Sequence, residues 1–118
     1  DILQRERASA ALERTRGLAK RVLTQAELAL YEKSAQPDRF FAKRFAAKEA
    51  VVKALGTGIG RGVGWQHITI TNNDMGKPDV QLSGGALASA QHQGIVTVHL
   101  SYSDERDYIV AFAIAESS

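Results

Sequence analysis

Glu49 and Lys53 place a carboxylate and an ammonium group four residues apart in an Ala-rich stretch that is typical of a helix. On a helix this spacing projects both side chains from one face. Small residues, which leave room for a ligand or a second chain, share that face, namely Ala42, Ala46 and Ala50. The Gly-rich run at residues 56–62 follows directly, and its backbone N–H groups can approach phosphate oxygens. Together these features indicate a pyrophosphate-binding site.

Each part of this pattern also has an ordinary structural explanation. A Glu–Lys pair at this spacing is commonly a surface ion pair on a solvated helix, and a Gly-rich run after a helix is commonly a C-cap and connector. The run follows a helix rather than a strand and lacks the G-x-x-x-x-G-K-[ST] order, which excludes a P-loop. From these residues alone, the pyrophosphate site and the plain surface helix both stay open.

The charges of the chain are distributed unevenly. Residues 1–61 carry 13 Lys and Arg against 7 Asp and Glu, whereas residues 62–118 carry 2 against 6. A basic half predicts an anionic partner, which can be a nucleic acid, a phosphorylated cofactor or an acidic protein. A solvated basic face explains the same charges, so charge alone does not choose among these.

Composition excludes several classes of protein. The chain has no Cys, which rules out disulfides and thiolate nucleophiles or metal ligands. Its longest apolar runs are short, as at residues 109–115, and a membrane-spanning helix needs about 20 apolar residues. No secretory signal pattern is present. We therefore expect a cytoplasmic protein that does not bind a membrane.

The periodicity of the chain predicts helices first and strands later. Thr24 and Glu27 have the spacing of a capping box, Pro37 opens a long helix, and Gly56 ends it. The predicted helices cover residues 5–15, 24–33, 37–55 and 86–92, and the predicted strands cover residues 67–71, 80–82, 95–102 and 108–115. The expected fold is α+β, with helices packed on an antiparallel sheet in a single domain of residues 1–118.

Several motifs in one order resemble those of a known family. They are KRVLTQAEL at residues 20–28, FFAKRFAAKEA at residues 40–50, KALGTGIG at residues 53–60, DMGKP at residues 74–78 and HLSYSDERDY at residues 99–108. The chain resembles the bacterial holo-acyl-carrier-protein synthases, the short-chain group of the 4′-phosphopantetheinyl transferases, over nearly its whole length. At Asp104 it departs from them, because many relatives have His there.

The resemblance implies a fold, an activity and partners. It implies the 4′-phosphopantetheinyl transferase fold and transfer of 4′-phosphopantetheine from coenzyme A to a serine of apo-acyl carrier protein, which releases 3′,5′-ADP. The reaction is expected to need Mg²⁺ and to serve fatty acid biosynthesis. The resembling enzymes are homotrimers with active sites at subunit interfaces, so a homotrimer is expected. The general base stays open between a metal-bound water and a carboxylate near the metal.

The resemblance also assigns roles to particular residues. Glu49 and Asp1 correspond to the metal-binding carboxylates, and Lys53 corresponds to a lysine beside the coenzyme A phosphates. The expected coenzyme A contacts are Arg44, Lys53, Gly56, Thr57, Gly58, Gly76, Lys77 and Pro78. Relatives have a strand that runs into the residue matching Asp1, and the residues of that strand are absent before Asp1. We therefore expect the sequence to begin partway through the polypeptide.

Arginines on the first predicted helix are expected to bind the acidic carrier. Arg7 and Arg14 are seven residues apart and so share one helix face, with Arg16 nearby. In resembling enzymes, arginines at such positions bind the acidic second helix of acyl carrier protein, and a guanidinium fork suits a carboxylate. A solvated helix with interspersed glutamates is the ordinary alternative.

A different class of function stays in competition. A small, basic, non-catalytic module for DNA or RNA would also explain the positive first half of the chain. However, the sequence lacks the interleaved aromatic and basic residues of an RNA-recognition motif and any helix-turn-helix pattern. The resemblance favours the enzyme, with no nucleic acid as partner.

Overall fold

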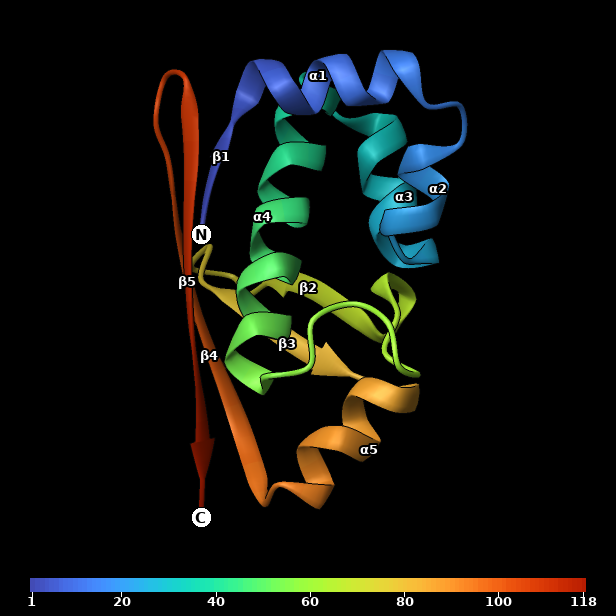
Figure 1. Ribbon diagram of the computed structural model, residues 1–118. Helices are drawn as coiled ribbons and strands as arrows, with labels where there is room; N and C mark the ends of the chain where they lie inside the picture. The colour runs from blue at the N-terminus through green and yellow to red at the C-terminus, as the bar shows by residue number, and fades with distance from the viewer.

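The computed structural model describes residues 1–118 and has an α+β architecture (Figure 1). In chain order its elements are β1 (Ile2–Gln4), α1 (Arg5–Arg14), α2 (Leu18–Val22), α3 (Gln25–Lys33), α4 (Pro37–Leu55), the 3-10 helix η1 (Trp65–His67), β2 (Ile68–Asn72), β3 (Pro78–Leu82), α5 (Gly84–His92), β4 (Ile95–Asp104) and β5 (Tyr108–Ser117). The predicted α+β class is confirmed. None of the helices combines the length and apolar composition needed to cross a membrane.

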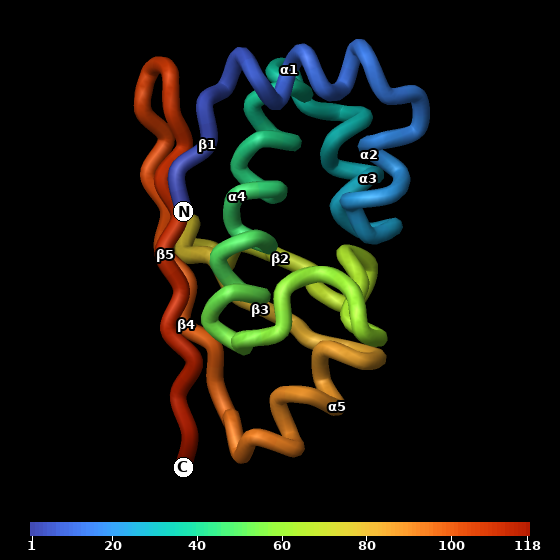
Figure 2. The backbone as a smooth tube through the Cα atoms, in the orientation of Figure 1, coloured from blue at the N-terminus to red at the C-terminus, as the bar shows by residue number.

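Helix α4 is the central element, and its limits follow from local chemistry. Pro37 occupies the first turn, where its fixed φ suits a helix and its missing N–H costs nothing. Gly56 ends the helix at φ 77°, in the left-handed region that glycine adopts without strain. Figure 2 shows the helix running between β5 on one side and α2, α3 and the β2–β3 hairpin on the other.

Two hydrophobic clusters meet along α4. One cluster, shared with α1, α2 and β5, contains the α4 residues Phe41, Ala42, Ala46 and Ala50. The other, shared with β2, α5 and β4, contains the α4 residues Ala47, Val51, Val52 and Leu55. Since α4 is covered on several sides, its orientation is set by burial rather than by a single apolar stripe.

The strands form two antiparallel sheets. The first has the order β1-β5-β4, with β5 in the middle, and the second is the β2–β3 hairpin, closed by the pair Asn72 and Pro78. The long β4–β5 hairpin lies along one side of the molecule in Figure 1, with α4 packed on its inner face. Helix α1 crosses the top, where the polypeptide leaves β1.

Three short elements were not predicted, namely α2, η1 and β1. Helix α2 has five residues, too few for a periodic pattern, and it owes its stability to tertiary contacts such as the burial of Val22. At the amino end, the three residues after Asp1 form a strand that was not predicted and pair with β5 at Ile2–Val110, Leu3–Ile109 and Gln4–Tyr108. A three-residue strand carries no alternation signal, so only the pairing with β5 reveals it.

Candidate functional site

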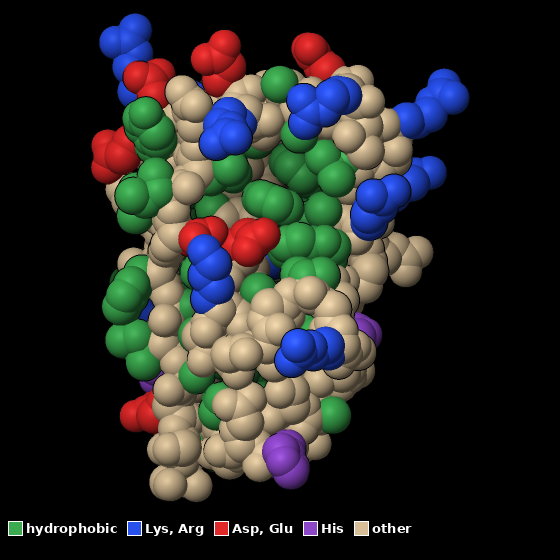
Figure 3. Space-filling model, in the orientation of Figure 1, with side chains coloured by type: hydrophobic (Ala, Val, Ile, Leu, Met, Phe, Trp, Pro, Cys, Tyr) green, Lys and Arg blue, Asp and Glu red, His purple; other side chains and the backbone are tan.

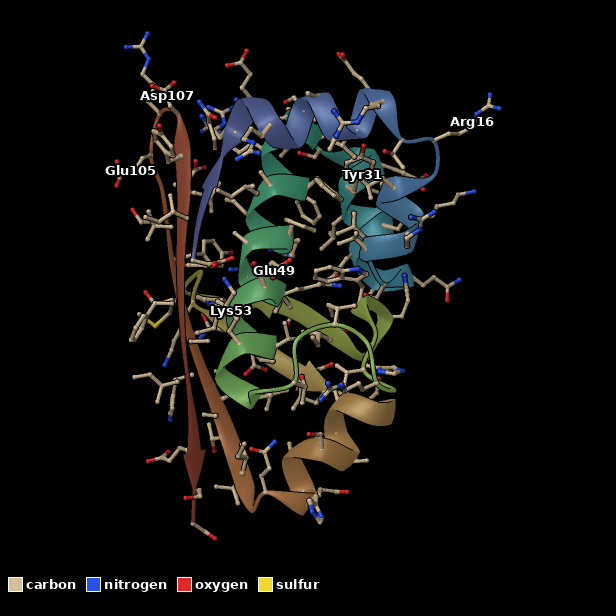
Figure 4. All side chains as sticks on the ribbon, viewed as in Figure 1. Arg16, Tyr31, Glu49, Lys53, Glu105 and Asp107 are labelled. Atoms are coloured by element: carbon tan, nitrogen blue, oxygen red, sulfur yellow. The ribbon has the colours of Figure 1, made fainter.

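Glu49 and Lys53 lie one turn apart on the same side of α4, as their spacing predicts (Figure 4). The Lys53 Nζ atom lies 2.5 Å from Oδ1 of Asp1, at the end of the chain marked N in Figure 1. Because Lys53 holds Asp1, this end of the chain is anchored to the side of α4 that carries Glu49. The structure thus brings together Asp1 and Lys53, two predicted site residues that lie 52 positions apart in the sequence.

The backbone fixes the place of Asp1 independently of its side chain. The N–H of Ala111 donates to the Asp1 carbonyl oxygen at 2.7 Å, which extends the pairing between β1 and β5. The Asp1 side chain is 19% exposed and that of Lys53 is 65% exposed. The site is therefore a surface feature built on a buried helix.

The carboxylates of Asp1 and Glu49 are the donors available here for a metal ion. Glu49 is half-buried and forms no ion pair, so its oxygens are free to bind a cation. The chain has no group of three or more His, Cys, Asp or Glu that could hold a metal. Mg²⁺ is commonly bound through one or two carboxylates, with substrate phosphates and water completing its shell. The donor set fits Mg²⁺ in that mode.

The loop after α4 uses its first N–H groups to end the helix. Gly56 donates to Lys53, and both Thr57 and Gly58 donate to the carbonyl of Val52 at 3.1 and 3.2 Å. The N–H groups of residues 56–58 are therefore engaged in the C-cap and are not available to phosphate oxygens in this structure. A phosphate contact from residues 56–58 would fall to the Thr57 hydroxyl, which now donates to Gly58.

The turn between β2 and β3 borders a polar hollow. Its volume is about 330 Å³, and its lining consists of Thr71, Asn72, Asn73, Lys77, Pro78 and Asp79. Gly76 has φ 84°, so the turn requires glycine there. Lys77 is exposed and forms no ion pair, which leaves its ammonium free for an anion.

Arg44 does not face solvent. Its side chain is buried, its Nε atom lies 3.7 Å from Oε2 of Glu27, and its Nη2 group donates to Oδ1 of Asn72 at 3.3 Å. It also lies over the Phe40 ring, 4.5 Å from the centroid. Arg44 was predicted to contact coenzyme A, but in this structure it reaches the 72–78 turn from within the protein.

The predicted carrier-binding arginines lie on a separate surface. Arg7 and Arg14 are exposed on α1, Arg16 is exposed just after it, and none of the three forms an ion pair. Figure 3 shows basic side chains along the top of the molecule and down the side of the helical layer, with acidic ones among them. Three cations are thus free to meet an acidic partner.

Sequence reasoning missed the buried pair of Glu27 and Lys48. Lys48 is fully buried, and its Nζ atom lies 2.6 Å from Oε1 of Glu27 and donates to the carbonyls of Val22 and Trp65. Burial lowers the pKa of Lys48, and the carboxylate of Glu27 partly opposes that shift. The capping box identified Glu27 as a cap, and no local signal identifies it as the partner of Lys48.

The chain is similar to known proteins in both sequence and structure. The sequence model described as the 4′-phosphopantetheinyl transferase superfamily matches residues 1–113. A holo-[acyl-carrier-protein] synthase of Shewanella baltica is 53% identical over 118 residues, which cover 99% of this chain and 93% of the relative. The crystal structure of the Neisseria meningitidis holo-[acyl-carrier-protein] synthase superposes with a TM-score of 0.89 at 39% identity and covers 99% of this chain and 94% of its own. The Bacillus anthracis synthase, solved in complex with CoA (3′,5′-ADP), superposes with a TM-score of 0.82 at 35% identity and covers 100% and 93%.

Proposed function

Since the chain belongs to the 4′-phosphopantetheinyl transferase superfamily, and within it to the holo-[acyl-carrier-protein] synthases, we propose that Asp1, Glu49 and Lys53 form the site of its transfer reaction. In that reaction 4′-phosphopantetheine passes from coenzyme A to a serine of apo-acyl carrier protein, and the other product is 3′,5′-ADP. The observation that carries the proposal is the contact between Lys53 and Asp1 beside Glu49. It gathers an ammonium and two carboxylates at one surface of α4.

In the proposed reaction the serine hydroxyl attacks the β-phosphorus of coenzyme A. The bond from that phosphorus to the bridging oxygen breaks, the serine proton is lost to a base, and the bridging oxygen leaves with 3′,5′-ADP. Lys53 can turn its ammonium from Asp1 to the phosphates, because its side chain is 65% exposed. There it would stabilise the negative charge that develops on the departing phosphate.

Mg²⁺ is proposed as the cofactor, held by Asp1 and Glu49. When bound, it would neutralise charge on the diphosphate and orient it. Glu49 is suited to this role because it is half-buried and not engaged in an ion pair. Asp1 is suited because β5 holds its backbone while its carboxylate lies at the protein surface.

The nucleotide end of coenzyme A is proposed to bind at the turn of Gly76, Lys77 and Pro78. The support is the polar hollow beside this turn and the unpaired ammonium of Lys77. Acyl carrier protein is proposed to bind on α1 through Arg7, Arg14 and Arg16, whose guanidinium groups are exposed and unpaired. Docking the carrier there would bring its serine to the diphosphate, and such positioning supplies much of the rate of a transfer reaction. Service to fatty acid biosynthesis and a cytoplasmic location stay predictions.

A homotrimer is proposed from the outer face of β5. Side chains on a solvated sheet face are mostly polar, yet this face of β5 and its neighbour β1 is apolar through Ile2, Tyr108, Val110, Phe112 and Ile114. Figure 3 shows hydrophobic side chains along the edge of the molecule that β4 and β5 form. A patch of this kind marks a protein interface. Copies of this chain packed through β5 would bury it, and a mass other than that of three chains by sedimentation equilibrium would overturn this part of the proposal.

The transfer assay tests the function itself. Purified protein is incubated with coenzyme A, apo-acyl carrier protein and Mg²⁺, and mass spectrometry follows the carrier while chromatography follows 3′,5′-ADP. We expect both products in equal amounts, no transfer in excess EDTA, and recovery when Mg²⁺ is restored. Absence of modified carrier at every Mg²⁺ concentration would refute the proposal, and transfer unaffected by EDTA would remove the metal from it.

A further inference from the structure

Resting on the proposed function, we propose that Glu27 is a positioning residue for the nucleotide-binding turn, which it places through Arg44 and Asn72. Glu27 itself touches neither the turn nor the candidate metal ligands. Its influence would pass through three side chains that are far apart in the sequence and lie in one connected series. Each link in this series can be removed separately.

The Glu27 carboxylate is held from all sides. Its side chain is 1% exposed. Oε1 accepts the Thr24 N–H at 2.9 Å and lies 2.6 Å from Lys48 Nζ, while Oε2 accepts the Ile70 N–H at 2.8 Å and lies 3.7 Å from Arg44 Nε. Each oxygen therefore meets one backbone N–H and one cation. This carboxylate has a single possible position, fixed by α3, α4 and β2 together.

Arg44 depends on Glu27 for its placement. Its Nε atom is buried and lacks a hydrogen bond, so the charge of Glu27 and the face of Phe40 hold the guanidinium together with the bond to Asn72. Two buried cations, Arg44 and Lys48, share this one carboxylate. Removing the negative charge would leave both without compensation, and the guanidinium would move toward solvent.

Asn72 passes the position of Arg44 to the turn. Its Oδ1 atom accepts from Arg44, and its amide nitrogen donates to the Gly76 carbonyl at 2.9 Å and to the Tyr102 hydroxyl at 3.1 Å. Because Arg44 can only donate, it dictates that the amide oxygen faces inward and the amide nitrogen faces the turn. Without that donor the amide loses one of its three hydrogen bonds and holds the Gly76 carbonyl less firmly.

The turn responds as a unit because it is internally rigid. Asn73 Oδ1 accepts the N–H groups of Met75 and Lys77, both at 2.9 Å, and Asn73 donates to the Lys77 carbonyl. Besides the β2–β3 pairing that ends at Asn72 and Pro78, the Asn72 amide links this turn to Arg44, so the turn can shift when that link is weakened. Lys77 would then be displaced from the nucleotide while Asp1, Glu49 and Lys53 stay in place. The expected signature is weaker coenzyme A binding with little change at the reacting phosphate.

Asn72→Ala tests the series at an exposed residue and leaves Arg44 beside the carboxylate of Glu27. We expect KM for coenzyme A to rise about tenfold, with kcat and KM for the carrier within about twofold of wild type. Gln81→Ala, at an exposed position of β3 without a side-chain hydrogen bond, is the matched control and should change none of them. An unchanged KM for coenzyme A in Asn72→Ala would overturn the proposal.

A double-mutant cycle separates positioning from a general loss of stability. Arg44→Lys keeps the charge beside Glu27 but lacks the second donor that reaches Asn72. It should raise KM for coenzyme A as Asn72→Ala does, and the double variant should be no worse than either single one. Additive effects would show that Arg44 and Asn72 act separately, which contradicts the series. Glu27→Gln, whose folding is checked first by thermal unfolding, should give the same KM shift, and an unchanged KM in a folded Glu27→Gln protein would remove Glu27.

Failure of the proposed function has its own signature. If the wild-type protein transfers nothing, the function is refuted, and hydrogen exchange at residues 73–77 then judges the series by itself. Faster exchange there in Asn72→Ala and Arg44→Lys, but not in Gln81→Ala, would support the positioning role. Unchanged exchange would overturn it.

Discussion

Lys53 Nζ lies 2.5 Å from Asp1 Oδ1, which joins the last turn of α4 to the residue that precedes β1. The pair is partly exposed, so it contributes at most about 1 kcal/mol to stability. Its importance is that it gathers charged groups at one surface. Changing either residue should therefore lower the rate of transfer rather than the stability of the fold.

Replacing Lys53 with Gln should lower kcat about 10²–10³-fold, because the ammonium that meets the departing phosphate is lost. Thermal unfolding should be nearly unchanged, since the side chain is largely exposed. Initial rates of carrier modification measure the effect. Lys33→Gln, at an exposed position at the end of α3, is the control and should behave as wild type. A Lys53→Gln rate within about threefold of wild type would exclude this role.

Replacing Glu49 with Gln should abolish detectable transfer and leave the fold intact. The amide keeps the size of the side chain but removes the charge that binds Mg²⁺, and Glu49 has no ion pair to lose. Transfer rates over a range of Mg²⁺ concentrations measure the loss of turnover and the loss of Mg²⁺ binding. Glu32→Gln, on the exposed side of α3, should be silent. Unchanged turnover would remove Glu49 from the site.

Reversing the charge at Arg14 should weaken binding of the carrier protein more than binding of coenzyme A. Arg14→Glu replaces an exposed, unpaired cation on α1 with an anion, which repels an acidic partner. KM for the carrier should rise at least tenfold at low salt, and the difference from wild type should shrink at higher salt. Lys33→Glu makes the same charge change on α3 and is the control. Equal loss of affinity for both substrates would count against docking on α1.

Gly85 should tolerate no side chain. A Cβ atom there would lie 1.8 Å from the carbonyl oxygen of Gly62, which belongs to the loop after α4. Gly85→Ala should therefore lower the free energy of unfolding by about 1–3 kcal/mol, although alanine normally favours a helix. Gly64→Ala is the control, because its Cβ would meet nothing closer than 3.9 Å and its φ is −121°. Denaturant midpoints compare the two, and a Gly85→Ala protein as stable as wild type would refute the close approach.

The buried Lys48 should make stability depend on pH in the alkaline range. Its pKa in the folded protein is lowered from the ordinary value of 10.5, chiefly by burial. Between the lowered pKa and 10.5 the unfolded chain binds the proton more tightly, so the contribution of Lys48 to the free energy of unfolding rises with pH. Below that window both states are protonated and the contribution is constant.

Lys48→Met should remove this rise and lower stability overall, because a buried ion pair is broken. Tyr31, whose pKa is raised by burial and by Asp38, gives the opposite slope above pH 10, but it is present in both proteins and cancels in their difference. Denaturant unfolding from pH 7 to 11 supplies the measurement. If the difference between wild type and Lys48→Met is independent of pH, Lys48 does not have a lowered pKa. Lys33→Met should leave the pH profile unchanged.

Local rules were enough for most of the secondary structure. Thr24 and Glu27 predicted the start of α3, and the structure has both hydrogen bonds of the capping box. Pro37 and Gly56 predicted the two ends of α4, because proline suits the first turn of a helix and glycine suits its C-cap. The spacing of Glu49 and Lys53 placed them on one helix face because a helical turn is the same in every protein.

Contacts between distant residues were beyond those rules. Asp1 and Lys53 meet across 52 positions, and only the resemblance to a family suggested it. Arg44 and Lys48 carry charges that predict exposure, yet both are buried, because Glu27 supplies a carboxylate from another helix. The chain itself dictates the propensity, caps and spacing of its elements, since these depend on near neighbours. Which charges face solvent and which face one another depends on how the elements pack, and packing is a property of the whole fold.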